Sequence, residues 1–130
     1  MQTIAVIGAG LMGSGIAQSL AMGGKTVYLY DISEAALEKG MQSIQKSLAR
    51  FVKAGKLQEQ EATTILARIQ TETNLQEAVK EADVVVEAVP EHLPLKKQVF
   101  EQLDRYAKQE AIAVTLNSDV FVAKIASCFA

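Results

Sequence analysis

Short apolar runs and a helical spacing alternate at the start of the chain. The runs at residues 4–7 and 26–30 each predict a buried strand. Between them, apolar residues recur at helical spacing from Met12 to Leu20, and a glycine pair at 23–24 predicts the end of that helix. A strand, a helix and a second strand within about 30 residues indicate a βαβ unit, whose strands are parallel.

The next segment has the pattern of two helices joined by a short break. Ser33 is a candidate N-cap for the first helix, and Ala-Gly-Lys at 54–56 interrupts it. A second helix is expected to carry Ile65, Leu66 and Ile69. We therefore predict an antiparallel helical hairpin. Its first helix has one apolar stripe, with residues at alternating steps of four and three, formed by Leu37, Met41, Ile44, Leu48 and Phe51.

Strand and helix patterns continue to alternate through the rest of the chain, and Pro90 ends the clearest strand pattern. We expect a Rossmann-type doubly wound parallel sheet, ordered 3-2-1-4-5, with the helical hairpin as an insertion and no sixth strand. One domain would span residues 1–130. The elements predicted after the hairpin are strands near residues 69–73, 83–89 and 111–116, helices at 76–81 and 93–108, and the start of another helix after them.

The composition suits a soluble globular domain. Of the 130 residues, 49% are hydrophobic and 22% are charged, and the net charge is −2. This balance favours neither a nucleic-acid partner nor a membrane surface. No apolar run reaches the roughly 18 residues that a membrane helix needs, and we read no signal peptide. Cys128 is the single cysteine, so we expect no internal disulfide, no metal site and a cytoplasmic protein.

A glycine-rich turn follows the first predicted strand. Residues 8–13, Gly-Ala-Gly-Leu-Met-Gly, match G-x-G-x-x-G where the strand meets the helix. Gly8 would permit a tight turn, Gly10 would let a pyrophosphate approach the backbone, and Gly13 would let helix and strand pack closely. Leu11 and Met12 begin the helix, whose free N–H groups and dipole favour phosphates. The turn is therefore a candidate dinucleotide-binding loop.

An acid closes the second predicted strand. Asp31 follows Gly13 by 18 residues, close to the interval at which such folds place an acceptor for the adenosine ribose hydroxyls. Its charge should repel a 2′-phosphate, and Ile32, Ser33 and Glu34 supply no compensating cation. The sequence therefore favours NAD over NADP. The alternative is a structural turn with three glycines and a solvated acid at the strand end.

Three stretches resemble the 3-hydroxyacyl-CoA dehydrogenases, a family that includes bacterial 3-hydroxybutyryl-CoA dehydrogenases. They are IAVIGAGLMGSGIAQ at 4–18, LYDISEAALEKG at 29–40 and ADVVVEAVPEHLPLKKQVFEQLD at 82–104, and together with the hairpin they cover nearly the whole chain. Many nicotinamide enzymes share the first stretch, whereas the hairpin and the third are more specific. The resemblance implies NAD-dependent oxidation of an (S)-3-hydroxyacyl-CoA to the 3-ketoacyl-CoA in fatty-acid or butyrate metabolism.

The resemblance implies cofactor-side roles for three further positions. Glu91 looks like the family's glutamate near the nicotinamide ribose, and Lys96 looks like its cofactor-contacting lysine. Ser118 aligns with a serine between cofactor and substrate, which makes it a candidate catalytic and cofactor-binding residue. The alternatives are that Glu91 is simply a polar residue after a strand, that Lys96 lies on a solvated helix face and that Ser118 is a helix N-cap. His92 stands where the family commonly has asparagine, so we interpret it as a surface residue.

On the substrate side, the resemblance implies that the hairpin contacts coenzyme A. Ser47 sits where the family's hairpin touches CoA. A family lysine near that site falls on Ala54 here, so Lys53 or Lys56 is expected to replace it. The hairpin is also expected to bind CoA weakly through basic residues on one helix and the turn after it, near Lys46, Arg50, Lys53 and Lys56. The alternative is that these polar residues form only a solvated helix face.

The chain departs from the family pattern after the fifth predicted strand. The family has Asn-Thr-Ser-Ser-Leu there, whereas this chain has Leu116-Asn117-Ser118-Asp119-Val120, which puts the substrate-side geometry in doubt. The resemblance also implies a catalytic histidine, its partner glutamate and a helical dimerisation domain further along the chain than these residues. We therefore expect the 130 residues alone to lack dehydrogenase activity and to bind CoA weakly.

Two other functions remain open at this point. One is a non-catalytic NAD-binding or sensing module. The other is a portion of a different nicotinamide dehydrogenase of the β-hydroxyacid type, against which the hairpin at 33–69 argues. CoA binding would distinguish a CoA dehydrogenase from a sensor. We also expect self-association through the edge of the strand at 111–116 and the apolar segment after it, because an unpaired, uncharged strand edge invites another chain.

Overall fold

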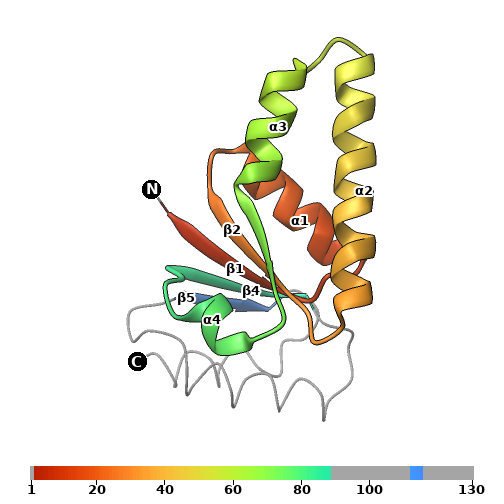
Figure 1. Ribbon diagram of the computed structural model, residues 1–130. Coiled ribbons are helices and arrows are strands. Elements are labelled where there is room, and N and C mark those ends of the chain that lie inside the picture. Colours follow the sequence, from red (N-terminus) through yellow and green to blue (C-terminus); the bar gives the residue numbers. More distant parts are fainter. Residues whose placement is uncertain (1, 89–111, 116–130) are drawn as a thin grey trace.

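The computed structural model describes residues 2–88 and a strand at 112–115. Strands and helices alternate along the chain, as the hydrophobic pattern predicts (Figure 1). The elements are β1 (Thr3–Ile7), α1 (Leu11–Met22), β2 (Thr26–Tyr30), α2 (Glu34–Lys53), α3 (Glu59–Ala67), β3 (Ile69–Glu72), α4 (Leu75–Val79), β4 (Val84–Glu87) and β5 (Ile112–Thr115).

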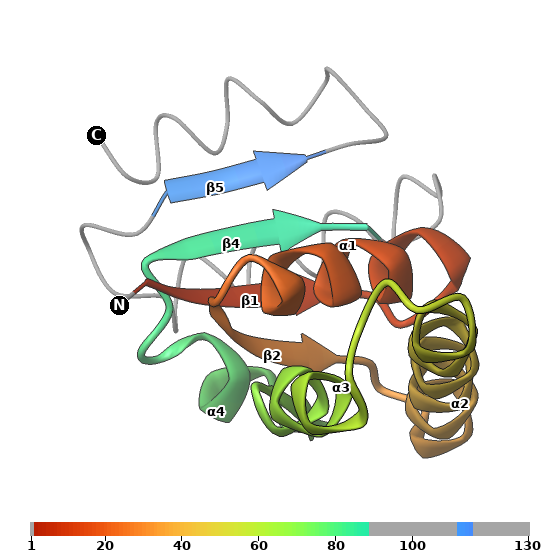
Figure 2. The ribbon, with the colours of Figure 1, turned by 90° about the horizontal axis from the view of Figure 1, so that it is seen from above.

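The strands form one five-stranded sheet in the order β3-β2-β1-β4-β5, and every neighbouring pair is parallel. Figure 2 shows β5, β4, β1 and β2 side by side. The predicted strand order and the Rossmann-type doubly wound class are therefore confirmed. Because the strands are parallel, their carboxyl ends lie along one edge, where Ile7 is in register with Tyr30 and with Glu87.

Helices cover both faces of the sheet, because side chains alternate between the faces with a period of two. Ile4 and Val6 of β1 belong to a core that also contains buried residues of α1, α2 and α3. Ala5 and Ile7 are buried as well but lie outside that cluster, on the opposite face of the strand. There α4 packs on β1, β2 and β3 (Figure 1). Within the described residues, α1, α2 and α3 therefore cover one face of the sheet and α4 covers part of the other.

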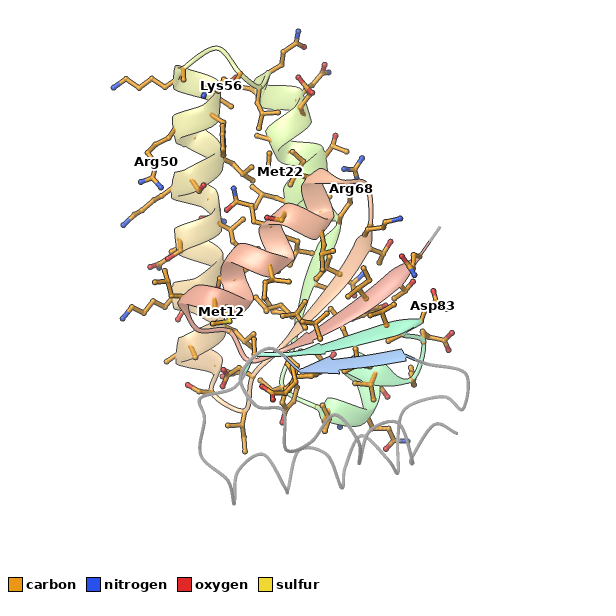
Figure 3. The ribbon with its side chains drawn as sticks, turned by 180° about the vertical axis from the view of Figure 1, so that it is seen from behind. Met12, Met22, Arg50, Lys56, Arg68 and Asp83 are labelled. Carbon is orange, nitrogen blue, oxygen red and sulfur yellow. The ribbon has the colours of Figure 1, made fainter. Side chains whose placement is uncertain are left out.

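The predicted helical hairpin is present, with α2 and α3 side by side and antiparallel (Figure 1). The Ser33 side chain accepts a hydrogen bond from the N–H of Ala36 at 3.1 Å, which confirms the predicted N-cap. Gly55, with φ of +75°, makes the turn between the helices. At the other end of the hairpin, the Arg68 guanidinium donates to the Ala21 carbonyl at 2.7 Å, tying α3 to the end of α1 (Figure 3).

Two predicted boundaries in this region are wrong. The spacing allows Ile69 both in the second hairpin helix and in a strand near 69–73; the strand is confirmed, and the helix ends earlier, because Ile69 begins β3, pairs with Val27 and is buried. Helical spacing could not distinguish a last helical residue from the first residue of a buried strand. The helix predicted at 76–81 runs instead from Leu75 to Val79, because the Asn74 side chain accepts a hydrogen bond from the N–H of Glu77 and sets the start. The helix predicted at 93–108 lies outside the described residues.

Candidate functional site

The glycine-rich turn lies at the carboxyl edge of the sheet, between β1 and α1. Gly8 has φ of +109°, a conformation that side chains rarely adopt, and its N–H donates to the Tyr30 carbonyl at 2.7 Å. A Cβ placed on Gly13 would lie 1.7 Å from the Gly8 carbonyl oxygen. The structure thus supports the predicted roles of Gly8 in the tight turn and of Gly13 in close packing.

The first turn of α1 leaves its backbone N–H groups open. Its N-cap is Gly10, no side chain caps it, and the turn contains no acid. A Cβ on Gly10 would meet no atom within 4 Å, so the loop is accessible from that side. Leu11 and Met12 are 91% and 49% exposed. Uncapped N–H groups together with the positive end of the helix dipole suit a phosphate.

Asp31 joins this loop at the end of β2. Its Oδ2 accepts a hydrogen bond from the backbone N–H of Ala9 at 3.0 Å, and its Oδ1 accepts one from the N–H of Ser33 at 2.9 Å. These two bonds do not fit the alternative of a merely solvated strand end. A carboxylate has about four acceptor positions, so it retains capacity for further hydrogen bonds. Ile32 beside it is 83% exposed and offers an apolar surface near the same edge.

The negative charge of Asp31 affects the ionisation of Tyr30. Its pKa is raised, first by burial of the phenol and second by the negative charge of Asp31. The phenol therefore stays neutral at physiological pH beside the candidate ribose acceptor.

A second contact, which the sequence motifs do not indicate directly, links the loop to the hairpin through Ser14 and Gly40. The buried Ser14 hydroxyl donates to the Ala9 carbonyl at 3.0 Å. A Cβ on Gly40 of α2 would lie 2.6 Å from Ser14 Oγ and 3.0 Å from the Ala9 oxygen. The available signal was a glycine inside an otherwise regular amphipathic helix, which costs stability unless packing requires it.

A groove of about 290 Å³ runs between α1 and α2 and begins at the glycine-rich loop. Among the described residues, two cations and no carboxylate line it. The Gln18 amide crosses from α1 to α2 and donates to Ser47 Oγ at 2.9 Å. We call this feature the α1–α2 groove, and its lining residues are Leu11, Ser14, Gly15, Gln18, Ser43, Ile44, Lys46, Ser47 and Arg50.

The structure does not bring Ser47 and Lys53 together in one groove. Lys53 lines a different hollow between α2 and α3, of about 420 Å³, which it shares with Glu59. Arg50 lies with Ser47 instead, and Figure 3 shows both Arg50 and Lys56, the latter at the tip of the hairpin. Of the basic residues that the sequence offered for CoA, Lys46 and Arg50 therefore line the groove of Ser47, whereas Lys53 does not.

Glu91, Lys96 and Ser118, predicted from the resemblance, lie outside the described residues. Within residues 2–88 the structure adds one buried acid, Glu87, which is 1% exposed at the carboxyl end of β4. No three His, Cys, Asp or Glu side chains of the described part are grouped so as to hold a metal ion. None of its helices is both long and apolar enough to cross a membrane.

A glycine-rich strand–helix turn, an uncapped helix N-terminus and an acid on the adjacent strand together define a Rossmann-type dinucleotide-binding domain. A family model described as "3-hydroxyacyl-CoA dehydrogenase, NAD binding domain" matches residues 3–130. The chain belongs to this family.

The relatives agree with this assignment. The chain is 38% identical over 127 residues to a probable 3-hydroxybutyryl-CoA dehydrogenase of Bacillus subtilis, covering 98% of this chain and 44% of that protein. It is also 38% identical to the 3-hydroxyadipyl-CoA dehydrogenase of Escherichia coli, covering 98% and 26%. The solved (S)-3-hydroxybutyryl-CoA dehydrogenase of Ralstonia eutropha superposes with a TM-score of 0.90 at 36% identity, covering 98% and 45%. The chain thus spans less than half the length of these relatives.

Proposed function

We propose that the chain forms the NAD-binding portion of a dehydrogenase that oxidises (S)-3-hydroxyacyl-CoA to 3-ketoacyl-CoA in fatty-acid or butyrate metabolism. The observation that carries the proposal is that the start of α1 belongs both to the glycine-rich loop and to the α1–α2 groove. Its first turn closes the glycine-rich loop, and Leu11 in that turn also lines the α1–α2 groove. A dinucleotide at the loop and an anionic thioester in the groove would therefore be neighbours.

The described residues fit the binding of NAD. When bound, NAD supplies the acceptor for the hydride that leaves C3 of the substrate. The N–H groups of Leu11, Met12 and Gly13 would hold the pyrophosphate, and Asp31 would accept hydrogen bonds from the adenosine ribose hydroxyls. The Asp31 charge would also repel a 2′-phosphate, which makes NAD the preferred cofactor over NADP.

The α1–α2 groove fits the CoA portion of the substrate. Lys46 and Arg50 line it, with no competing carboxylate in the part of the chain that the structure describes, so it offers positive charge to the CoA phosphates. Ser47 lies between them and provides a hydroxyl for hydrogen bonding. We include Arg50 in the substrate-binding set, and we expect a smaller contribution from Lys53, which lines the other hollow together with Glu59.

Titration calorimetry with NADH, NADPH and coenzyme A tests the proposal. We expect NADH to bind more tightly than NADPH, and CoA to bind at millimolar concentration. Arg50→Gln should weaken CoA binding by about three- to tenfold, because Arg50 is exposed and solvent screens its interaction with a phosphate. Lys53→Gln, which removes the same charge one turn away, is the matched control and should change it less. NADH binding without any CoA binding would favour the alternative of a non-catalytic NAD-binding or sensing module.

We further propose that the 130 residues alone do not oxidise 3-hydroxybutyryl-CoA and that the protein acts in the cytoplasm. His92 is the chain's one histidine, and we interpret it as a surface residue, not as the general base that the reaction needs. Steady NADH formation by the repurified chain would contradict the first of these expectations.

A further inference from the structure

Gln18 makes two contacts from one amide nitrogen. Its Nε2 lies 2.9 Å from Ser47 Oγ on α2 and 3.8 Å from Met22 Sδ on its own helix. A thioether sulfur can accept a hydrogen bond but cannot donate one. The amide end that faces both groups is therefore the NH2 end, and Gln18 acts as a donor toward Ser47. Both of its N–H groups are then in use, which fixes the orientation of the amide.

The Ser47 hydroxyl differs from the two threonine hydroxyls of α3, the other helix of the hairpin. On α3, Thr63 and Thr64 donate their hydroxyls to the carbonyls of Glu59 and Gln60, one turn earlier, at 3.1 and 3.0 Å. Ser47 has no such bond to an acceptor within the described residues. Its oxygen instead accepts from Gln18, which leaves its own O–H free to donate elsewhere. Ser47 is half-buried and lines the α1–α2 groove.

We propose that Gln18 is a positioning residue that fixes the Ser47 hydroxyl as a hydrogen-bond donor into the α1–α2 groove. The group it would serve is an acceptor oxygen of the CoA portion, either an amide carbonyl or a phosphate. This inference rests on the proposed function, because it assigns how that same groove recognises its ligand. It adds a residue of the cofactor-binding helix α1 to the recognition of the substrate.

Three variants separate this role from a merely structural one. Gln18→Met keeps the length of the side chain but removes the donor, so Ser47 can turn back toward its own helix. Gln18→Glu keeps the shape but only accepts, so it draws the Ser47 hydrogen away from the groove. Ser47→Ala removes the hydroxyl itself. Gln45→Glu introduces the same charge as Gln18→Glu at an exposed position of α2 that lines the other hollow, and it controls for charge.

The measurement is the affinity of the 130-residue chain for coenzyme A, by calorimetry, for single and double variants. Gln18→Met and Ser47→Ala should each weaken binding by roughly three- to tenfold, the worth of one hydrogen bond. The double variant should bind about as weakly as Ser47→Ala alone, because Gln18 acts through Ser47. Gln18→Glu should weaken binding more than Gln18→Met, and by clearly more than Gln45→Glu does.

The possible outcomes are distinct. Additive losses in the double variant would overturn the positioning role while leaving CoA binding in the groove intact. A Gln18→Glu variant that binds CoA as the Gln45→Glu control does would also overturn it. Failure of the unmodified chain to bind CoA at millimolar concentration would remove the proposed function and this inference together. As a spectroscopic check, the NMR signals of the Gln18 side-chain amide should shift in Ser47→Ala and on addition of CoA.

Discussion

The carboxylate of Asp31 lies 3.0 Å from the backbone nitrogen of Ala9 and accepts its hydrogen bond. The end of β2 therefore holds the second residue of the glycine-rich loop, while the Gly8 N–H donates to the carbonyl of Tyr30 on the same strand. Tyr30, the last residue of β2, and Asp31, which follows it, thus hold the loop from one side by hydrogen bonds to Gly8 and Ala9. This relationship gives Asp31 a structural task besides its proposed contact with the ribose.

The first prediction concerns Asp31→Ala and Asp31→Asn. Each should lower NADH affinity by about 10- to 100-fold, since a hydrogen bond to a charged group contributes roughly 1.5–3 kcal/mol. Each should also narrow the gap between NADH and NADPH, because the repulsion of a 2′-phosphate is lost. Asn retains an oxygen that can accept from Ala9, so it should lose less thermal stability than Ala. Calorimetric titration and thermal unfolding measure these effects, and equal NADH and NADPH affinity in the unmodified chain would contradict the assignment.

The second prediction compares two glycines of the loop. Gly13→Ala places a Cβ 1.7 Å from the Gly8 carbonyl oxygen, so it should destabilise the fold by more than about 3 kcal/mol. Gly10→Ala meets no protein atom within 4 Å and should change stability little. It should nevertheless weaken NADH binding by about tenfold or more, because the added methyl would stand between the backbone N–H groups and the pyrophosphate.

Urea unfolding and NADH titration distinguish these two expectations. Equal losses of stability in Gly13→Ala and Gly10→Ala would contradict the difference in space that the structure shows at these two positions. Unchanged NADH affinity in Gly10→Ala would show that the pyrophosphate does not approach from the open side of Gly10.

The third prediction concerns the contact between the loop and the hairpin. Gly40→Ala should destabilise the chain by about 1–3 kcal/mol, the usual cost of overpacking, because its Cβ would crowd Ser14 Oγ and the Ala9 oxygen. Gly15→Ala is the matched control inside α1. Its Cβ would meet nothing within 4 Å, so it should stabilise the helix by about 0.5–1 kcal/mol. If both substitutions changed the midpoint of urea unfolding in the same direction, the close approach at Gly40 would be refuted.

The fourth prediction concerns alkaline pH. The pKa of Tyr30 is raised from 10.0 by burial and by Asp31, so the folded chain holds the phenolic proton more tightly than the unfolded chain. This contribution to stability is complete below the unfolded pKa and is lost as pH rises from that value through the folded pKa. As pH rises above about 10, the free energy of unfolding should therefore fall less in Tyr30→Phe than in the unmodified chain.

Lys80 contributes in the same direction, since its hydrogen bond to Glu77 and the Glu77 charge raise its pKa. The comparison is therefore made in a Lys80→Met background, by urea unfolding on either side of pH 10. Asp31→Asn should lower the Tyr30 pKa partway, seen in the ultraviolet absorbance of tyrosinate. If the free energy of unfolding depended on pH in the same way with and without the Tyr30 hydroxyl, the expectation would be contradicted.

The fifth prediction is self-association. In the described part of the sheet, β5 lies at the edge and pairs with β4. Its sequence, Ile-Ala-Val-Thr, carries no charge to discourage pairing with another chain. Light scattering across a concentration series should show growing mass, and Thr115→Lys should reduce it. A clean monomer at high micromolar concentration would mean that this edge is protected.

The sequence alone determined the elements and their order. Short continuous apolar runs and apolar stripes of period 3.6 indicate strands and helices directly, and parallel strands joined by helices leave few possible topologies. The glycine spacing and Asp31 likewise predicted the dinucleotide loop, because a G-x-G-x-x-G turn needs particular glycines for steric reasons that are local in sequence. The hairpin followed from the apolar stripe of α2 and the break at 54–56.

Only the tertiary structure decided which residues meet across elements. Ile69 belongs to β3 and not to the end of α3, because pairing with Val27 offers it both backbone hydrogen bonds and burial, whereas the local pattern allowed either element. The packing of α2 against α1 and α3 turns Ser47 and Arg50 toward the α1–α2 groove and places Lys53 in the other hollow. The contacts of Gly40 with Ser14 and of Gln18 with Ser47 join residues 26 and 29 positions apart. Such contacts depend on how helices pack, and packing is set by the shape of the whole core and not by the spacing along any one element.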